Sequence, residues 1–243
     1  MIVENMEVIR QRVATACKKA GRDTREIQIL LATKTVTADR IREAILAGYL
    51  LIGENKVQEI KQKFEDLQDL KPVQHFIGHL QTNKIKELLK YKVSCIQSVD
   101  RFELALKLHQ RLIAENKSLE ILVQVNTSGE ASKFGVAPEQ AAALTQQIST
   151  LSSLHIKGLM TIGLFSNNRE KIRHCFSRLK SLQQEISLLN IPNVEMKELS
   201  MGMSGDLEIA IEEGATIIRV GTAIFGKRNY PDSYYWNESA SVS

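Results

Sequence analysis

Long hydrophobic runs and a secretory leader are both lacking in this sequence. No apolar run approaches the roughly 18 residues that a helix needs to span a bilayer. The first residues, MIVENMEVIRQR, contain no basic segment leading into an apolar one, so a signal peptide is not expected. Cysteine is scarce as well. Cys17, Cys95 and Cys175 are odd in number and widely spaced, which favours reduced thiols over a disulfide framework. We therefore expect a cytoplasmic protein with no membrane partner.

An excess of one charge and a proline-rich linker are also absent. The chain has 32 basic and 28 acidic residues, a net charge of +4, and only 4 prolines. This balance does not indicate a nucleic acid or an anionic membrane as a partner. Since no shift in composition divides the body, we expect one domain over residues 1–227. Residues 228–243 have no period and predict a tail, or alternatively an aromatic motif for a partner, because they include Tyr234, Tyr235 and Trp236.

Several motifs with a known chemistry are missing. No G-x-G-x-x-G follows the first apolar run, and residues 126–135, NTSGEASKFG, lack the order of a phosphate-binding P-loop. The G-x-S-x-G nucleophile elbow is absent too. His75 and His79 have the i, i+4 spacing of a zinc-binding helix, but no glutamate lies between them, and HFIGH is typical of a strand that enters a turn. We therefore expect no metal site.

The sequence does contain a regular alternation of two periodicities. Residues 2–20 carry apolar residues at spacings of three and four and are followed by Gly21, which predicts an amphipathic helix. Short apolar runs then predict eight strands, at 27–32, 49–52, 73–77, 93–97, 119–126, 154–160, 195–200 and 216–220. Segments with a helical period lie between them, at 38–47, 55–66, 82–91, 101–115, 138–150, 168–188 and 205–213. Eight such repeats in roughly 220 residues predict an α/β fold, a (β/α)8 barrel of the TIM type with an extra N-terminal helix.

The first predicted strand ends in a lysine. Residues 27–35 read IQILLATKT, an almost continuous apolar run followed at once by Lys34. Such a run is typical of a parallel strand that is buried on both faces. The carboxyl ends of such strands are where α/β folds carry their chemistry. Taken alone, however, this stretch fits a solvated lysine at a strand end at least as well.

Two glycine-containing loops follow the last two predicted strands. Residues 199–206, LSMGMSGD, lead into a helix beginning at Asp206, for which Ser204 is predicted as the N-cap. In IIRVGTAIFG, Gly221 and Thr222 expose backbone N–H groups at the start of a short helix. Loops in these two places form the phosphate site of many barrels, although two ordinary turns are the alternative. Closure of the barrel would place a bound phosphate opposite the lysine amine, which is the arrangement that pyridoxal 5′-phosphate requires.

Together these motifs resemble the pyridoxal-phosphate homeostasis protein family, which is similar to the barrel domain of fold-type III enzymes such as alanine racemase. The resemblance runs from about residue 6 to residue 227 and rests on IQILLATKT, IGENKVQE, HFIGHLQTNK, IQSVDR, VNTSGEASKFG, GLMTIG, LSMGMSGD and IIRVGTAIFG. It implies a protein of intracellular vitamin B6 balance that holds pyridoxal 5′-phosphate without established catalytic turnover. The departures are small: Leu31-Ala32-Thr33 replaces a more usual Ala-Val-Ser, and Val36 follows instead of the usual polar-proline pair.

Carried over position by position, the resemblance implies seven cofactor-binding residues. They are Lys34 for the Schiff base, Ser204, Gly221 and Thr222 for the phosphate, Arg219 facing the pyridine nitrogen, and Asn55 and His75 as wall positions.

An arginine beside the ring nitrogen disfavours its protonation, which weakens the cofactor as an electron sink and fits a carrier, without excluding racemisation. A racemase of this type also needs a second base, a tyrosine from an additional domain, and 243 residues leave no room for that domain after the eighth strand. We therefore expect a monomer that is not an enzyme and that supplies apo-enzymes with the cofactor. The alternatives are a racemase of limited activity, and an RNA- or protein-binding module that uses the lysines of residues 84–92 or the tail.

Overall fold

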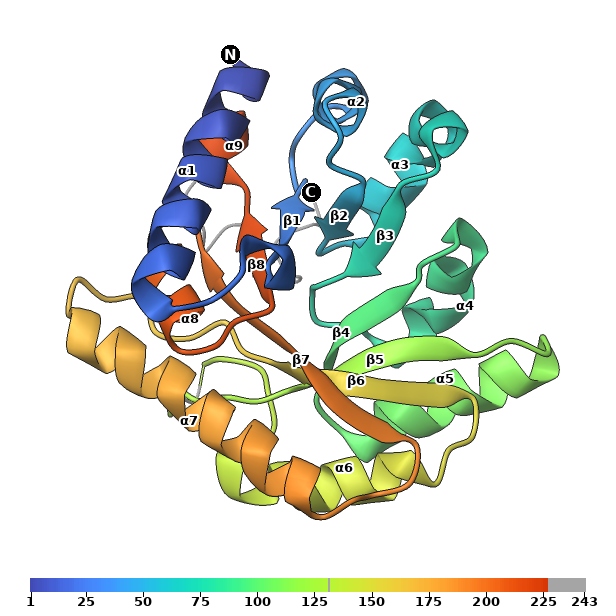
Figure 1. Cartoon of the computed structure of the whole chain (residues 1–243). Coiled ribbons are helices and arrows are strands. Elements are labelled where there is room, and N and C mark those ends of the chain that lie inside the picture. The colour runs from blue at the N-terminus through green and yellow to red at the C-terminus, as the bar shows by residue number, and fades with distance from the viewer. Residues whose placement is uncertain (131, 227–243) are drawn as a thin grey trace.

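The polypeptide folds as a closed barrel of parallel strands surrounded by helices. The computed structural model describes residues 1–130 and 132–226, and in this part of the chain eight strands pair in sequence order, with β8 returning to β1 (Figure 1). The strands are β1 (Gln28–Ala32), β2 (Leu51–Glu54), β3 (Val73–Phe76), β4 (Cys95–Val99), β5 (Leu119–Gln124), β6 (Leu154–Met160), β7 (Val194–Met203) and β8 (Ile217–Val220). The predicted fold class is confirmed.

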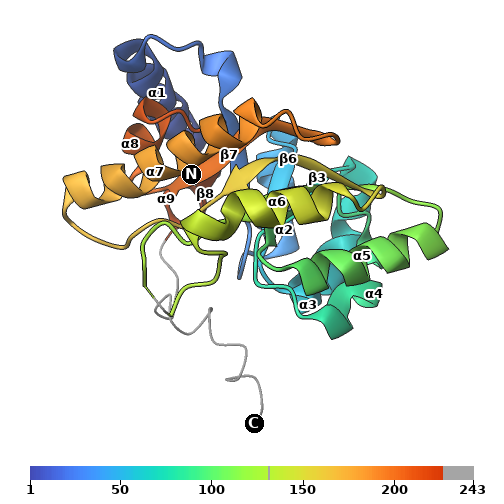
Figure 2. The ribbon, with the colours of Figure 1, turned by 90° about the horizontal axis from the view of Figure 1, so that it is seen from below.

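Helices follow the strands and cover the outside of the barrel. They are α1 (Ile2–Ala20), α2 (Ala38–Leu46), α3 (Val57–Leu67), α4 (Ile85–Leu88), α5 (Phe102–Ala114), α6 (Ala141–Ser149), α7 (Arg169–Leu188), α8 (Leu207–Glu212) and α9 (Thr222–Phe225). Figure 2, turned by 90°, shows α6 and α7 lying against the side of the barrel that β6 and β7 form. Within residues 1–130 and 132–226, none of these helices has the length and apolarity that crossing a membrane would require.

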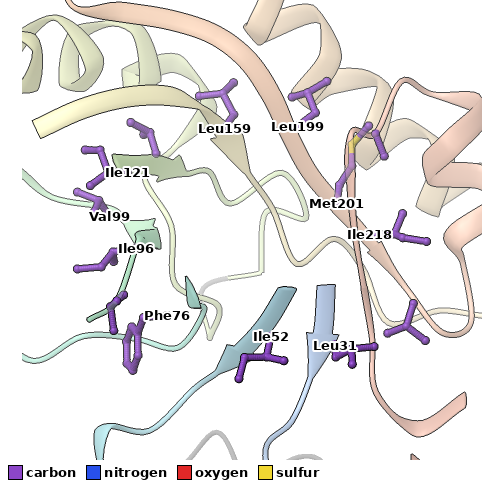
Figure 3. Close-up of a cluster of buried hydrophobic side chains, with 14 of the residues drawn as sticks. Leu31, Ile52, Phe76, Ile96, Val99, Ile121, Leu159, Leu199, Met201 and Ile218 are labelled. Atoms are coloured by element: carbon purple, nitrogen blue, oxygen red, sulfur yellow. The ribbon is translucent and has the colours of Figure 1, made fainter. Parts of the chain in front are cut away.

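The core lies mainly between the strands and the helices. Successive side chains of β1 point to opposite faces, so Leu31 points outward to the helices while Leu30 belongs to a separate cluster inside the barrel. Every strand sends at least one large apolar side chain into the outer layer: Leu31, Ile52, Phe76, Ile96, Val99, Ile121, Leu159, Leu199, Met201 and Ile218 (Figure 3). Burying each such side chain contributes about 1.5–3 kcal/mol to folding. The inner cluster is smaller and consists of Leu30, Cys95, Leu122, Met160 and Ile217.

Strands β1 and β8 close the barrel. Leu30 pairs with Arg219 and Leu31 with Val220 in a parallel register. The residues that follow these strands therefore leave the sheet side by side. Closure thus places the end of β1, which carries Lys34, next to the Gly221–Thr222 turn.

The predicted N-terminal helix covers this closure. In Figure 1, α1 lies alongside α8 and α9. The Arg12 guanidinium donates two hydrogen bonds to the Glu208 carboxylate, at 2.6 and 2.9 Å, and the Asn5 amide donates to the Ile224 carbonyl at 2.9 Å. The apolar side chains spaced at three and four residues are all buried: Ile2, Met6, Ile9, Val13 and Cys17.

Element boundaries differ from the predictions mainly where polar residues continue a strand. The fourth strand was expected to end at residue 97 but continues to Val99, because Gln97 and Ser98 are buried in the barrel wall. The seventh strand continues past the expected residue 200 to Met203, although Gly202 has a φ of 88°. The predicted tail at 228–243 lies outside the described residues, so its role stays a prediction.

The close approach of β6 and β7 gives a test of the fold. A Cβ atom at Gly158 would lie 1.9 Å from the Glu198 carbonyl oxygen, whereas nothing lies within 4 Å of one at Gly205. We expect Gly158→Ala to lower the free energy of unfolding in urea by about 2–3 kcal/mol, since the two backbones must separate. Gly205→Ala is the matched control for stability, and equal stability of the two variants would contradict the described packing.

Candidate functional site

A cavity of about 320 Å³ opens at the carboxyl ends of the barrel strands. Its walls come from the segments that follow β1, β2, β3, β6, β7 and β8. Of the seven residues proposed from the sequence, six line this cavity: Lys34, Asn55, Ser204, Arg219, Gly221 and Thr222. The fold therefore brings together residues that are up to 188 positions apart, from 34 to 222.

Lys34 lies in the turn that follows β1. The turn begins where the Thr33 N–H donates to the Gly53 carbonyl at 3.0 Å, and it closes where the Val36 N–H donates to the Thr33 carbonyl at 3.0 Å. Only 8% of the Lys34 residue is exposed, and it lines the cavity. The interpretation as a solvated lysine at a strand end is therefore wrong.

Ser204 joins the two glycine-containing loops. Its hydroxyl oxygen accepts a hydrogen bond from the Ala223 N–H, in the first turn of α9, at 3.3 Å. The predicted role of Ser204 as N-cap of α8 is wrong, since Asp206 holds that position and its carboxylate accepts the Met203 N–H at 2.6 Å. The reason is that Ser204 faces the neighbouring loop and satisfies a helix N–H group there instead.

Arg219 is the buried cation of the site. Its residue is 5% exposed, and its Nη1 and Nη2 atoms donate to the Ser200 hydroxyl at 2.7 Å and to the Thr161 carbonyl at 2.8 Å. Burial lowers the pKa of Arg219 to about 10, while the charge of Asp206 acts in the opposite direction. The guanidinium therefore keeps its positive charge at neutral pH.

A chain of hydrogen bonds continues from Arg219 across the barrel. Because a guanidinium can only donate, the Ser200 hydroxyl accepts from it and donates to Gln97 Oε1 at 2.6 Å. The Gln97 amide then donates to His75 Nδ1 at 2.8 Å. This direction leaves the proton of neutral His75 on Nε2.

The position of His75 differs from the prediction. It lines another cavity, of about 520 Å³, at the amino ends of the strands, and is not among the residues that line the cavity of Lys34. His75 is therefore corrected from a wall residue to the far end of the chain that reaches Arg219 through Gln97 and Ser200. Burial lowers its pKa from 6.5 to about 4, so the imidazole is neutral at neutral pH.

The matching sequence family is described as the N-terminal domain of alanine racemase, and its model covers residues 2–229. The pyridoxal phosphate homeostasis protein of Aquifex aeolicus is 43% identical over 93% of this chain and 98% of its own length. That of Pseudomonas aeruginosa is 41% identical over 94% of this chain and 96% of its own. The chain belongs to the pyridoxal phosphate homeostasis protein family. The resemblance inferred from the motifs is confirmed.

Solved structures agree with membership of the pyridoxal phosphate homeostasis protein family. PipY from Synechococcus elongatus, solved with pyridoxal phosphate bound, is 32% identical, covers 93% of this chain and all of its own, and superposes with a TM-score of 0.81. Alanine racemase from Corynebacterium glutamicum is 10% identical and shares the fold alone, with a TM-score of 0.69 over 94% of this chain and 61% of that one.

Sequence reasoning missed a charged residue and an apolar wall of the cavity. Asp206 lines it, and burial raises the pKa of this carboxyl. The apolar wall comprises Ile77, Ile162, Leu164, Phe165, Ile172 and Met203. Ile77 and Ile162 each lie one or two residues beyond a strand end. Asp206 could have been identified as the charged residue that ends LSMGMSGD. In the sequence alone, however, apolar residues beyond a strand cannot be distinguished from core residues.

The described residues contain no group of three histidine, cysteine, aspartate or glutamate side chains arranged to hold a metal ion. The spacing of His75 and His79 is not that of a helix here. The His79 ring instead stacks on Phe134, with their centroids 3.8 Å apart.

The lowered pKa of His75 makes stability depend on pH. As the pH falls below about 6.5, His75 is protonated in the unfolded chain but stays neutral in the folded protein until about pH 4. In His75→Gln, the new amide oxygen can still accept from Gln97. Between pH 6.5 and pH 4 we expect the free energy of unfolding of this variant to fall by about 3 kcal/mol less than that of the wild type. Urea unfolding at several pH values measures this difference. His174→Gln, at an exposed histidine, is the control, and parallel stability curves for the wild type and His75→Gln would contradict the assignment.

Proposed function

We propose that this protein binds pyridoxal 5′-phosphate as a Schiff base with Lys34 and serves in intracellular cofactor balance without catalytic turnover. The observation that carries the proposal is a single cavity that contains a buried lysine, a buried arginine and the first residues of a helix. These are the three groups that an aldehyde, a ring nitrogen and a phosphate on one small molecule would need.

The residues present suit the phosphate. Gly221 and Thr222 begin α9, where backbone N–H groups have no partner within the helix and the helix dipole favours an anion. Glycine at position 221 lets a ligand approach the backbone closely. Ser204 is already within hydrogen-bond distance of the same helical turn, at 3.3 Å from the Ala223 nitrogen, so its hydroxyl can contribute to the same anion site.

Arg219 suits the side of the ring that carries the nitrogen. Bound pyridoxal phosphate supplies an aldehyde that condenses with an amine and a pyridine ring that can withdraw electrons. A guanidinium held in place by Ser200 and Thr161 disfavours a proton on that ring nitrogen. Weaker electron withdrawal suits a protein that holds the cofactor.

The family supports the same conclusion. PipY has been solved both with and without pyridoxal phosphate, and it is 32% identical to this chain in both structures. The relatives from Aquifex aeolicus and Pseudomonas aeruginosa are named homeostasis proteins. We extend this to a monomer in the cytoplasm that supplies apo-enzymes with the cofactor.

A role without turnover is also supported by the groups around Lys34. Among the described residues that line the cavity, the titratable side chains are Lys34, Asp206 and Arg219. Arg219 cannot serve as a base, and the Asp206 carboxylate already accepts the Met203 N–H. Racemisation needs bases on both faces of the substrate carbon, and this set does not offer a second uncommitted one.

Borohydride reduction followed by peptide mass spectrometry tests the proposed bond. We expect the protein incubated with pyridoxal 5′-phosphate to carry the added mass on the peptide that contains Lys34. The Lys34→Ala variant should lose this label completely, because the amine that condenses with the aldehyde is gone. Lys117→Ala, on the surface, is the matched control and should keep the label.

Two results would overturn the proposal. A label of equal yield on another lysine in the wild type would place the cofactor elsewhere. Conversion of L-alanine to D-alanine by the purified protein, above the rate of the Lys34→Ala variant, would replace the carrier role with the alternative of a racemase of limited activity.

A further inference from the structure

Behind Lys34, on the outer side of the barrel, lies a buried cluster of charged side chains. Lys63, on α3, donates from its amine to three oxygens: the Thr33 carbonyl at 2.9 Å, Glu54 Oε1 at 2.7 Å and Glu59 Oε2 at 2.7 Å. These three bonds use every hydrogen of an ammonium group. Lys63 is 9% exposed, so it is fully committed to this cluster.

The cluster contains a carboxylate that is costly to bury. Glu54, at the end of β2, is 1% exposed, and burial raises its pKa while the charge of Lys63 acts in the opposite direction. Its Oε1 atom accepts from both Lys63 and the Thr33 hydroxyl, at 2.7 Å each, while Oε2 has no hydrogen-bond partner among the described residues. Buried ion pairs of this kind often contribute nothing to net stability, so stability alone does not account for the cluster.

The backbone beside Lys34 is strained. Thr35 has a φ of 64°, in the left-handed region that a β-branched residue rarely adopts. The Thr35 N–H donates to Glu59 Oε2 at 2.6 Å, and this oxygen also accepts from Lys63. Strained residues of this type persist where surrounding contacts hold them, and they gather at functional sites.

The cluster therefore holds both peptide groups that flank Lys34. On one side Lys63 binds the Thr33 carbonyl, and on the other Glu59 binds the Thr35 N–H. Glu54 and Lys63 line a cavity between the barrel and α3, while Lys34 lines the cavity inside the barrel mouth. The charged groups thus contact the backbone on both sides of Lys34 from outside the barrel, while the Lys34 residue lines the cavity on the inner side.

We propose that Glu59, Lys63 and Glu54 are positioning residues that fix the turn at 33–35 so that the Lys34 amine meets an aldehyde in the cavity. This inference rests on the proposed function. Fixing an amine in its reactive geometry raises the rate of condensation, and an error of about 1 Å in such placement can cost about 100-fold. The bond that forms is the C=N bond between Lys34 and the aldehyde carbon, and the aldehyde oxygen leaves as water.

The experiment measures how fast the apoprotein forms the bond. Pyridoxal 5′-phosphate is mixed with each variant, the reaction is stopped with borohydride at increasing times, and the label on the Lys34 peptide is quantified. Glu59→Ala removes the acceptor of the Thr35 N–H, and we expect the rate to fall about tenfold or more with the label still on Lys34. Glu59→Gln keeps an oxygen for that N–H and should stay within about threefold of the wild type.

Thr35→Gly separates positioning from stability. Glycine adopts a φ of 64° without strain, so we expect the urea midpoint to be unchanged or higher than in the wild type. The same change gives residue 35 more conformational freedom, so the turn holds Lys34 less rigidly and labelling should slow by about threefold or more. A merely structural role for the cluster would instead make the labelling rate follow the urea midpoint.

The controls distinguish this inference from the proposed function. Glu65→Ala, at an exposed glutamate on α3, should leave both readouts unchanged. Absence of label on Lys34 in the wild type would overturn the proposed function. A second outcome is that the wild type is labelled on Lys34, and that the Glu59→Ala and Thr35→Gly variants fold and are labelled at the wild-type rate. This outcome would overturn the positioning role while the proposed function stands.

Discussion

The parallel pairing of β1 with β8 is the interaction on which the rest of the molecule depends. Leu30 and Leu31 lie opposite Arg219 and Val220, so the chain segments that leave these strands are neighbours in space although they are far apart in sequence. Without this pairing, the turn with Lys34 and the turn with Gly221 would lie at opposite edges of an open sheet. Helix α1 protects the pairing from outside, through the ion pair of Arg12 with Glu208 on α8.

The barrel interior divides into an apolar half and a polar half. Leu30, Leu122 and Met160 pack together inside the barrel, whereas Gln97, Ser200 and Arg219 are joined by hydrogen bonds and are equally buried. A barrel filled only with apolar side chains would be the simpler way to gain stability. The buried guanidinium, the buried Glu54 and the strained Thr35 instead all lie on the segments around the cavity, as expected where function opposes stability.

Much of this could be predicted from the sequence, because strand order and the residues at strand ends follow from local periodicity and barrel geometry. The family and the fold were identified from motifs, and Lys34 and Gly221 were placed at the correct end of the barrel. The alternation of residues along a strand, however, predicts which side chains point into the barrel but not which end of the barrel they lie near. His75 points inward, but it lines the cavity at the amino ends of the strands. Partners 20 or more positions apart, such as Thr35 and Glu59, leave no signal within either segment, and for this reason the cluster behind Lys34 was missed.

The hydrogen-bond chain from Arg219 to His75 has a consequence for proton movement. A chain conducts a proton only if each member can accept one on one side and release one on the other. Arg219 has no lone pair to accept with, and the amide of Gln97 does not change its protonation state at ordinary pH. The chain therefore does not transfer protons between Arg219 and His75. Solvent in the cavity at the amino ends of the strands can exchange protons with His75, but these protons do not pass along the chain to Arg219, so each cavity exchanges protons with the solvent through its own mouth.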